Sequence, residues 1–120
     1  MKCAEMNSGA KKKALVTGST QGIGKAIAAR LVQDGFYVIV HCSSDIEKAK
    51  RVQSEIGAHA AVVGDLSEND VAEKLKAATG EVDVLVLNAS VQYKQTWREI
   101  TAELMQKQLQ VNFVSTVRLM

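Results

Sequence analysis

The chain contains a short apolar segment, residues 13–17, that leads straight into the glycine-rich stretch TGSTQGIG. From Gly22 onward, apolar side chains recur every three or four positions, which is the spacing of a helix with one buried face. Because Gly18, Gly22 and Gly24 have no Cβ, the backbone there can take positive φ and let a bulky group approach it. The pattern predicts a buried strand, a tight turn and a helix that packs back against the strand.

Strand and helix patterns then alternate to the end of the chain. We expect three further strands, over residues 36–41, 59–64 and 82–88. A last helix is expected from about Ala102 onward. Ser44 and Ser67 each precede an acidic residue by three positions, a capping-box spacing that predicts a helix start at each serine. Four strand–helix units whose strands are apolar on both faces predict an α/β fold, a doubly wound parallel sheet with helices on both faces.

The composition limits the class of protein. With 47% apolar residues in 120, the chain can bury one core, and we predict a single domain over residues 13–120 after a disordered lead at residues 1–12. The net charge is only +2, and the basic run Lys11–Lys13 is interpreted as a solvated flank, so we expect no nucleic-acid partner. No window is apolar for long enough to cross a bilayer, and the N-terminus lacks the apolar centre of a secretory signal.

The cysteines add little chemistry. Cys3 and Cys42 are too few for a disulfide framework, and no spacing typical of metal ligands is present. We therefore predict no metal site and no membrane partner, and a reducing, cytoplasmic location is the default expectation.

The glycine-rich turn is the strongest candidate for a ligand site. In a doubly wound sheet the ligand lies beyond the carboxyl ends of the strands, which is where this turn falls. The helix that begins near Gly22 directs unpaired N–H groups and the positive end of its dipole to the same place. We predict that a pyrophosphate binds there; the alternative is a glycine turn that serves only the fold.

Four motifs, in order along the chain, resemble those of the short-chain dehydrogenases/reductases, and of the 3-oxoacyl-carrier-protein reductase type in particular. TGSTQGIG resembles the family's TGxxxGxG motif, and GDLS resembles the segment with the family's aspartate after the third strand. LNAS resembles the family's NNAG segment, and QVNF resembles the segment that carries the catalytic-tetrad asparagine. The resemblance extends from Lys13 to the end of the chain. It implies a Rossmann-type fold and the binding of a nicotinamide dinucleotide.

The resemblance also implies which residues form the site. Asn112 is the expected catalytic residue, and Asp65 is the expected adenine contact. Leu87 and Ser90 depart from the family's pattern in LNAS, so we expect an altered ribose region there. The expected cofactor-binding residues are Gly18, Ser19, Thr20, Gln21, Gly22, Ile23, Gly24, His41, Ser43, Ser44, Asp65, Leu66, Asn88, Ala89 and Ser90.

The end of the second strand bears on the choice between NADP and NAD. Relatives specific for NAD place an acidic residue there, but this chain has VHCSS, with Asp34 too early and Asp45 too late. Without the acid a 2′-phosphate is not repelled, and the serine hydroxyls can donate to it, so NADP is favoured over NAD. Gln21 stands where NADP-binding relatives often carry a basic residue, which points the other way. For His41 and His59, an ordinary strand-end or surface position is favoured over a catalytic role.

The Tyr-x-x-x-Lys sequence that the family needs for acid–base chemistry does not occur in the 120 residues. We therefore expect an N-terminal portion, a truncated product or a subunit that needs another chain, inactive alone. The favoured function is the cofactor-binding part of an NAD(P)-dependent oxidoreductase that transfers hydride between nicotinamide and a carbonyl or alcohol substrate. The alternative is a non-catalytic nucleotide-binding or interaction module that pairs with another chain, and a full-length form can be a homo-oligomer.

Overall fold

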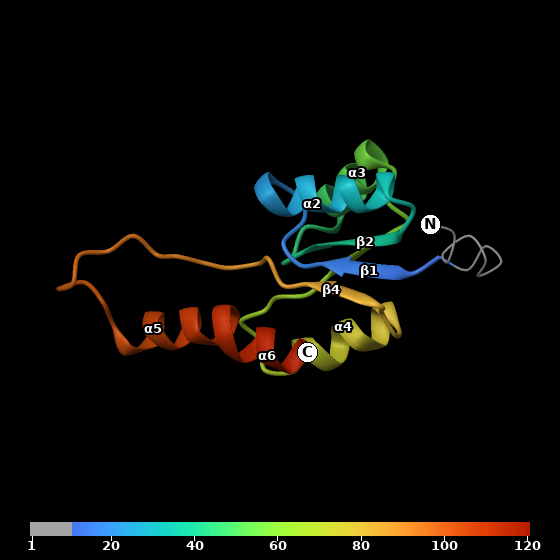
Figure 1. Cartoon of the computed structure of the whole chain (residues 1–120). Coiled ribbons are helices and arrows are strands. Elements are labelled where there is room, and N and C mark those ends of the chain that lie inside the picture. The colour runs from blue at the N-terminus through green and yellow to red at the C-terminus, as the bar shows by residue number, and fades with distance from the viewer. Residues whose placement is uncertain (1–10) are drawn as a thin grey trace.

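The computed structural model describes residues 11–120 and contains a four-stranded parallel sheet with helices on both faces (Figure 1). The strands are β1 (Lys13–Val16), β2 (Tyr37–Cys42), β3 (Ala60–Val63) and β4 (Val84–Val86). The helices are α2 (Gly22–Gln33), α3 (Ile46–Ile56), α4 (Val71–Thr79), α5 (Ala102–Leu109) and α6 (Ser115–Leu119), with a π-helical segment η1 (Gln110–Val114) before α6. The predicted fold class is confirmed. Residues 1–10 of the predicted lead, with Cys3, lie outside the described residues.

The strand order β3-β2-β1-β4 places the first strand inside the sheet. Val16 of β1 pairs with Val40 of β2 on one side and with Val86 of β4 on the other. Successive strands are added on one side of β1 and then on the opposite side, so β1 and β4 flank the topological switch point of the sheet. The loops that follow these two strands diverge there, which is where folds of this kind bind ligands.

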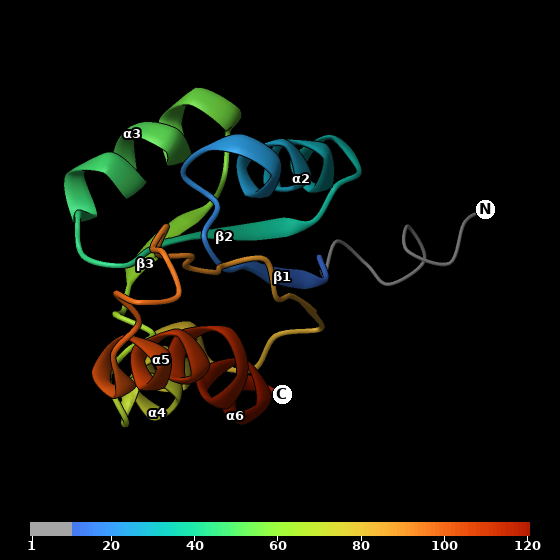
Figure 2. The same ribbon diagram turned by 90° about the vertical axis from the view of Figure 1, so that its left-hand side faces the viewer.

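Each face of the sheet has its own core. Helices α2 and α3 cover one face, and α4 and α6 lie on the other, as Figures 1 and 2 show from two directions. Helix α5 lies on the same side as α4 and α6 but beyond the end of the sheet (Figure 1), and it has no buried residue. The core under α2 and α3 consists of Val16, Ala28, Val38, Val40, Ala49 and Val52. The core on the opposite face consists of Leu66, Val71, Ala72, Leu75, Val111 and Leu119. Because both faces are covered, the strands are apolar at most positions, with Lys13 of β1 and His41 of β2 as exceptions.

The two predicted capping boxes are wrong. Helix α3 begins at Ile46, and its N-cap is Asp45, whose carboxylate accepts the N–H of Lys48 at 3.0 Å. Helix α4 begins only at Val71, after Asp70, without a side-chain cap. Ser67 lies four positions before the first helical residue, in a turn where its backbone N–H and its hydroxyl both donate to Asp65 Oδ1, at 2.9 and 2.7 Å. A local side-chain bond of this kind competes with helix initiation.

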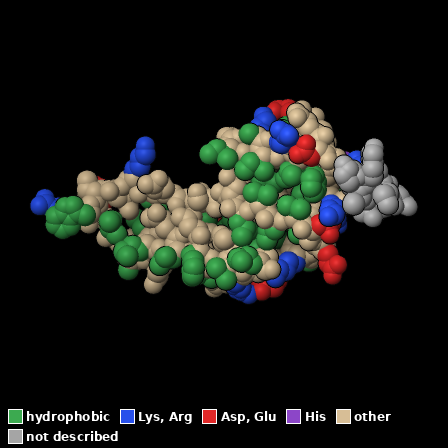
Figure 3. Space-filling model, viewed as in Figure 1, with side chains coloured by type: hydrophobic (Ala, Val, Ile, Leu, Met, Phe, Trp, Pro, Cys, Tyr) green, Lys and Arg blue, Asp and Glu red, His purple; other side chains and the backbone are tan. Residues whose placement is uncertain are grey.

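The last helical region is interrupted, which the sequence analysis did not predict. The backbone widens to a π-helical turn at η1 and then returns to α-helix in α6. Along the outer side of this region Met105, Leu109, Phe113 and Val117 are about half exposed or more, and Figure 3 shows hydrophobic side chains gathered along the same side. Within residues 11–120, no helix combines the length and the apolar character needed to cross a membrane.

Candidate cofactor site

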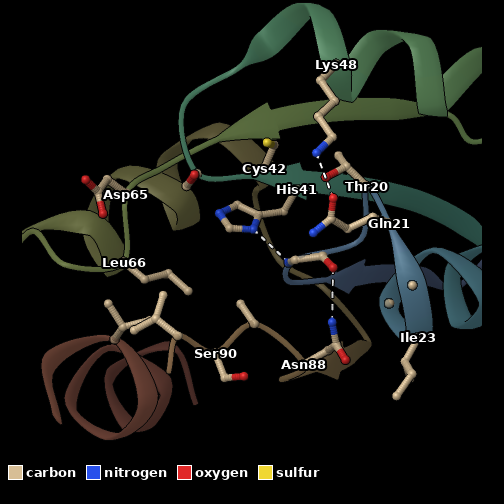
Figure 4. Close-up of a pocket in the computed structure, with 17 residues that line it drawn as sticks. Thr20, Gln21, Ile23, His41, Cys42, Lys48, Asp65, Leu66, Asn88 and Ser90 are labelled. Atoms are coloured by element: carbon tan, nitrogen blue, oxygen red, sulfur yellow. Dashed lines mark hydrogen bonds between the residues drawn. The ribbon is translucent and has the colours of Figure 1, made fainter. Parts of the chain in front are cut away.

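A cavity of about 590 Å³ opens at the carboxyl edge of the sheet, where the glycine loop (residues 17–24) meets the ends of β2, β3 and β4 (Figure 4). Its volume is in the range of small-molecule and cofactor sites. The predicted residues that line it are Gly18, Thr20, Gln21, Gly22, Ile23, Gly24, His41, Ser43, Asp65, Leu66, Asn88, Ala89 and Ser90. Ser19, Ser44 and Asn112 do not line it. Four further lining residues were not predicted from the sequence: Cys42, Lys48, Val91 and Val111.

The three glycines of the loop have different roles. Gly22 has a φ of +56° and no atom within 4 Å of the place where a Cβ would stand, so its backbone is open to the cavity. Gly18 has a φ of +62°, and a Cβ there would approach Ala89 to 3.0 Å. Gly24 is helical, and a Cβ would lie 2.3 Å from the carbonyl oxygen of Gly18 and 2.4 Å from Nδ2 of Asn88. Gly24 lines the cavity and, because it has no Cβ, also allows α2 to pack closely on the loop.

The first turn of α2 lines the cavity and has no side-chain cap among the described residues. It also contains no acidic residue. By contrast, Asp45 caps α3 and Thr101 caps α5, each by accepting a backbone N–H. The first N–H groups of a helix need acceptors, and the helix dipole favours an anion at this end. The geometry therefore fits a phosphate at the N-terminus of α2, as the sequence predicts.

His41 fixes the glycine loop to the sheet. Its side chain is buried, its Nδ1 accepts the backbone N–H of Gly18 at 3.0 Å, and its Nε2 lies 2.9 Å from the carbonyl oxygen of Gly64. Since the N–H of Gly18 can only donate and the oxygen of Gly64 can only accept, His41 is neutral, with its proton on Nε2. Burial lowers the pKa of His41 below its ordinary value of 6.5, although the bond to Gly64 opposes that shift.

Ser19 completes this attachment. Its hydroxyl accepts the N–H of His41 at 2.9 Å, and its own N–H donates to the carbonyl oxygen of His41 at 3.0 Å. Its side chain is fully buried and faces β2 rather than the cavity. Ser19 thus shapes the loop from behind, whereas His41 both holds the loop and lines the cavity.

Asn88 joins the loop to β4. Its Nδ2 donates to the carbonyl oxygens of Thr17 at 3.1 Å and Gly18 at 3.0 Å, and Figure 4 shows the second of these bonds. The hydroxyl of Thr17 accepts the N–H groups of Asn88 and Ala89, each at 3.0 Å. The amide of Asn88 therefore holds the loop, while its backbone and that of Ala89 form part of the cavity wall. Of the two departures from the family's pattern, Leu87 packs against the core under α4 and Ser90 lines the cavity.

Asp65 and Leu66 form the wall that follows β3. The backbone N–H and the hydroxyl of Ser67 both donate to Asp65 Oδ1, and these bonds hold the pKa of this carboxyl below its ordinary value. Leu66 is buried, and its carbonyl oxygen accepts the hydroxyl of Ser115 from α6 at 2.5 Å. Asp65 is therefore an ionised, oriented acceptor at the mouth of the cavity.

The end of β2 forms the opposite part of the cavity, with Cys42, Ser43 and Lys48 among its lining residues. Burial raises the pKa of the Cys42 thiol, but hydrogen bonds from the backbone of Asp45 and Ser44 outweigh it, so the pKa lies below its ordinary value. Backbone N–H groups that converge in this way favour negative charge. Nζ of Lys48 extends from α3 to Oε1 of Gln21 in the glycine loop, at 2.9 Å. Lys48 was missed because it belongs to a helix and to none of the family's motifs.

Asn112 lies in η1 and is bound on both sides to one residue of the loop that follows β4. Its Oδ1 accepts the N–H of Val91 and its Nδ2 donates to the carbonyl oxygen of Val91, each at 2.8 Å. Val91 itself lines the cavity. The side chain of Asn112 thus positions the cavity wall from outside.

The fold and the site define a nucleotide-binding α/β domain, and comparison with known proteins gives the family. The family model for short chain dehydrogenases matches residues 12–120. This chain belongs to the short-chain dehydrogenase family.

Individual relatives agree with this assignment. A 3-oxoacyl-[acyl-carrier-protein] reductase from Aggregatibacter actinomycetemcomitans is 42% identical over 106 residues, which are 82% of this chain and 44% of that protein. The solved structure of a 3-oxoacyl (acyl-carrier-protein) reductase from Agrobacterium tumefaciens C58 with NADP bound matches with a TM-score of 0.83 and 36% identity, over 99% of this chain and 48% of that one. A metagenomic short-chain oxidoreductase in complex with NADP matches with a TM-score of 0.78 and 33% identity, over 93% of this chain and 55% of that one. The chain thus spans about half the length of these relatives.

Proposed function

We propose that this chain is the cofactor-binding part of an NADP(H)-dependent oxidoreductase that transfers hydride between nicotinamide and a carbonyl or alcohol substrate. The observation that carries the proposal is the first turn of α2, which lines the cavity without a side-chain cap and beside the open backbone of Gly22. An uncapped helix start beside a glycine in positive φ is an acceptor-seeking site suited to a pyrophosphate.

Each wall of the cavity has a role in this proposal. The N–H groups at the start of α2 hold the pyrophosphate, since those of Thr17, Gly18 and Ser19 already donate within the protein. Ser43 and the turn after it hold the adenosine ribose, and Asp65 with Leu66 contacts the adenine. Asn88, Ala89 and Ser90 lie along the path to the nicotinamide ribose. The bound dinucleotide supplies the hydride. Asn112 serves as a positioning residue through Val91.

The family membership supports the reaction class, and two relatives with bound NADP support the choice of cofactor. Because the 120 residues contain no Tyr-x-x-x-Lys sequence, we expect the chain to bind cofactor without turnover. The second candidate, a non-catalytic nucleotide-binding or interaction module, is favoured by the exposed apolar stripe along α5 to α6 (Met105, Leu109, Phe113 and Val117).

Titration calorimetry with NADPH and with NADH tests the binding proposal directly. We expect both to bind, with the lower dissociation constant for NADPH. If the chain binds neither NADPH nor NADH, the proposed function is wrong. A parallel assay with a small carbonyl substrate should show NADPH oxidation no faster than in buffer, and steady oxidation that Asn112→Ala abolishes would contradict the expected lack of turnover.

A further inference from the structure

Lys48 is the basic residue that lines the cavity, and it spans two of its walls. It lies in the first turn of α3, directly after the end of β2, and is half-buried. From there its Nζ reaches the glycine loop, where it donates to Oε1 of Gln21 at 2.9 Å. Figure 4 shows the ammonium group of Lys48 above Thr20 and Gln21, between the glycine loop and the end of β2.

This position coincides with the expected place of the adenosine ribose. In dinucleotide-binding folds the residues at the end of the second strand recognise the substituent at the ribose 2′ position. Here that end carries Cys42 and Ser43, which line the cavity beside Lys48. The ammonium group is therefore close to the place where NADP(H) has a phosphate and NAD(H) has a hydroxyl.

The charges around Lys48 leave it available for an anion. Within residues 11–120 the structure records no carboxylate paired with it, whereas Lys25 on α2 is paired with Glu55 at 2.6 Å. The carboxylate of Asp45 caps the backbone of α3 and does not line the cavity. Gln21 offers only a neutral amide oxygen, so a phosphate in its place gives a shorter and stronger charge-assisted bond.

We propose that Lys48 is the residue that selects NADP(H) over NAD(H), by binding the 2′-phosphate in exchange for its bond to Gln21. The inference rests on the proposed function and adds to it the source of the positive charge. Gln21 occupies the loop position at which NADP-binding relatives often carry a basic residue. In this chain the positive charge comes instead from Lys48 on α3. The N–H groups after Cys42 add further donors on the same side.

Lys48→Met tests the proposal because it keeps the length of the side chain and removes the charge. We expect the dissociation constant for NADPH to rise about 10- to 100-fold, equivalent to about 1.4–2.8 kcal/mol. The constant for NADH should change less than about twofold, because a 2′-hydroxyl gains little from an ammonium group. Adenosine 2′,5′-bisphosphate and AMP should show the same difference without a nicotinamide ring. Lys48→Arg should retain the preference.

Lys50→Met is the matched control, since Lys50 lies on the same helix, carries the same charge and is exposed away from the cavity. It should leave both constants unchanged, which separates local contact from a general change in charge. Unchanged NADPH affinity in Lys48→Met, or an equal loss for NADPH and NADH, would overturn the assignment of Lys48. A wild-type chain that binds NADH at least as tightly as NADPH would also overturn it, together with the preference for NADP(H) in the proposed function, but would leave the dinucleotide-binding role standing. A wild-type chain that binds neither would overturn both.

Discussion

Nδ1 of His41 accepts the backbone N–H of Gly18 at 3.0 Å, so the end of β2 determines the shape of the loop after β1. The bond requires an imidazole without a proton on Nδ1. The opposite nitrogen is bound to the carbonyl oxygen of Gly64, so the ring joins three consecutive parts of the carboxyl edge. When His41 is protonated, Nδ1 becomes an N–H donor that faces the N–H of Gly18. The hydrogen bond that attaches the loop is then lost.

The first prediction concerns the effect of pH on stability. Because burial lowers the pKa of folded His41 below 6.5, the unfolded chain binds a proton more readily than the folded one. The free energy of unfolding should therefore be highest above pH 6.5 and fall as the pH drops through 6.5 toward the folded pKa. His41→Gln offers an acceptor and a donor that do not titrate, and should remove this dependence. Urea denaturation at a series of pH values measures both chains.

Two carboxyl groups also titrate, but in a lower range. The pKa of Asp65 lies below 3.8, because of Ser67, and that of Glu55 below 4.5, because of Lys25. Their contributions are present above these values and are lost as the pH falls through the folded pKa of each. The difference between wild type and His41→Gln from about pH 5 to 6.5 reports on His41, because His59, whose Nδ1 accepts the N–H of Val38, is common to both chains. An equal slope in the two chains over that interval would contradict the neutral-histidine interpretation.

The second prediction separates ligand contact from backbone strain. Gly22 and Gly57 have similar φ values, +56° and +74°, and a Cβ at either position meets no close neighbour. Alanine at either position should lower the free energy of unfolding by about 1–2 kcal/mol, the cost of a left-handed residue. Gly22→Ala should in addition weaken NADPH binding at least about tenfold, or about 1.4 kcal/mol, because its methyl group stands at the cavity wall. Gly57→Ala, at the end of α3, should bind as the wild type does.

Calorimetric titration with NADPH at a temperature where both variants are folded measures the difference. Equal affinities for the two variants would mean that the glycine loop serves the turn and not the phosphate.

The sequence predicts the fold well because both faces of the sheet are buried, and apolar strands between amphipathic helices leave few alternatives. The position of the glycine loop is predicted from the sequence, but the contacts that its residues make are not. Gly24 and Gly22 look alike in the sequence motif. In the structure, however, the place where a Cβ of Gly24 would stand is occupied by Gly18 and Asn88, which only folding brings together. The same applies to Lys48 and Gln21, which are 27 positions apart and meet across the cavity. The predicted helix caps failed for local reasons: Asp45 rather than Ser44 caps α3, and Ser67 is held in a turn with Asp65 before α4 begins.

The third prediction uses the sign of a stability change at Gly24. Helix propensity alone predicts that Gly24→Ala stabilises α2 by about 1 kcal/mol. The structure predicts the opposite, because the new Cβ would stand 2.3 Å from the Gly18 oxygen and 2.4 Å from Asn88 Nδ2. Both neighbours are held by hydrogen bonds and cannot move away freely. We expect a loss of about 1–3 kcal/mol, the usual cost of overpacking, measured by urea denaturation; a gain in stability would show that the packing of α2 on the loop is looser than described.

The last prediction concerns Asn112, whose amide pairs with both polar groups of the Val91 backbone at 2.8 Å. Asn112→Asp keeps the acceptor for the Val91 N–H but places a carboxylate oxygen against the Val91 carbonyl oxygen. Asn112→Ala removes both bonds, each worth about 1 kcal/mol in a protein. Both variants should therefore loosen the segment between β4 and α5, with faster amide hydrogen exchange at Val91 and faster tryptic cleavage after Lys94 and Arg98. Gln106→Ala, an exposed change on α5 whose side chain makes no recorded hydrogen bond within residues 11–120, is the control and should leave both rates unchanged. Exchange at Val91 as slow in Asn112→Ala as in the wild type would show that the loop is held by packing, and that Asn112 does not position the cavity wall.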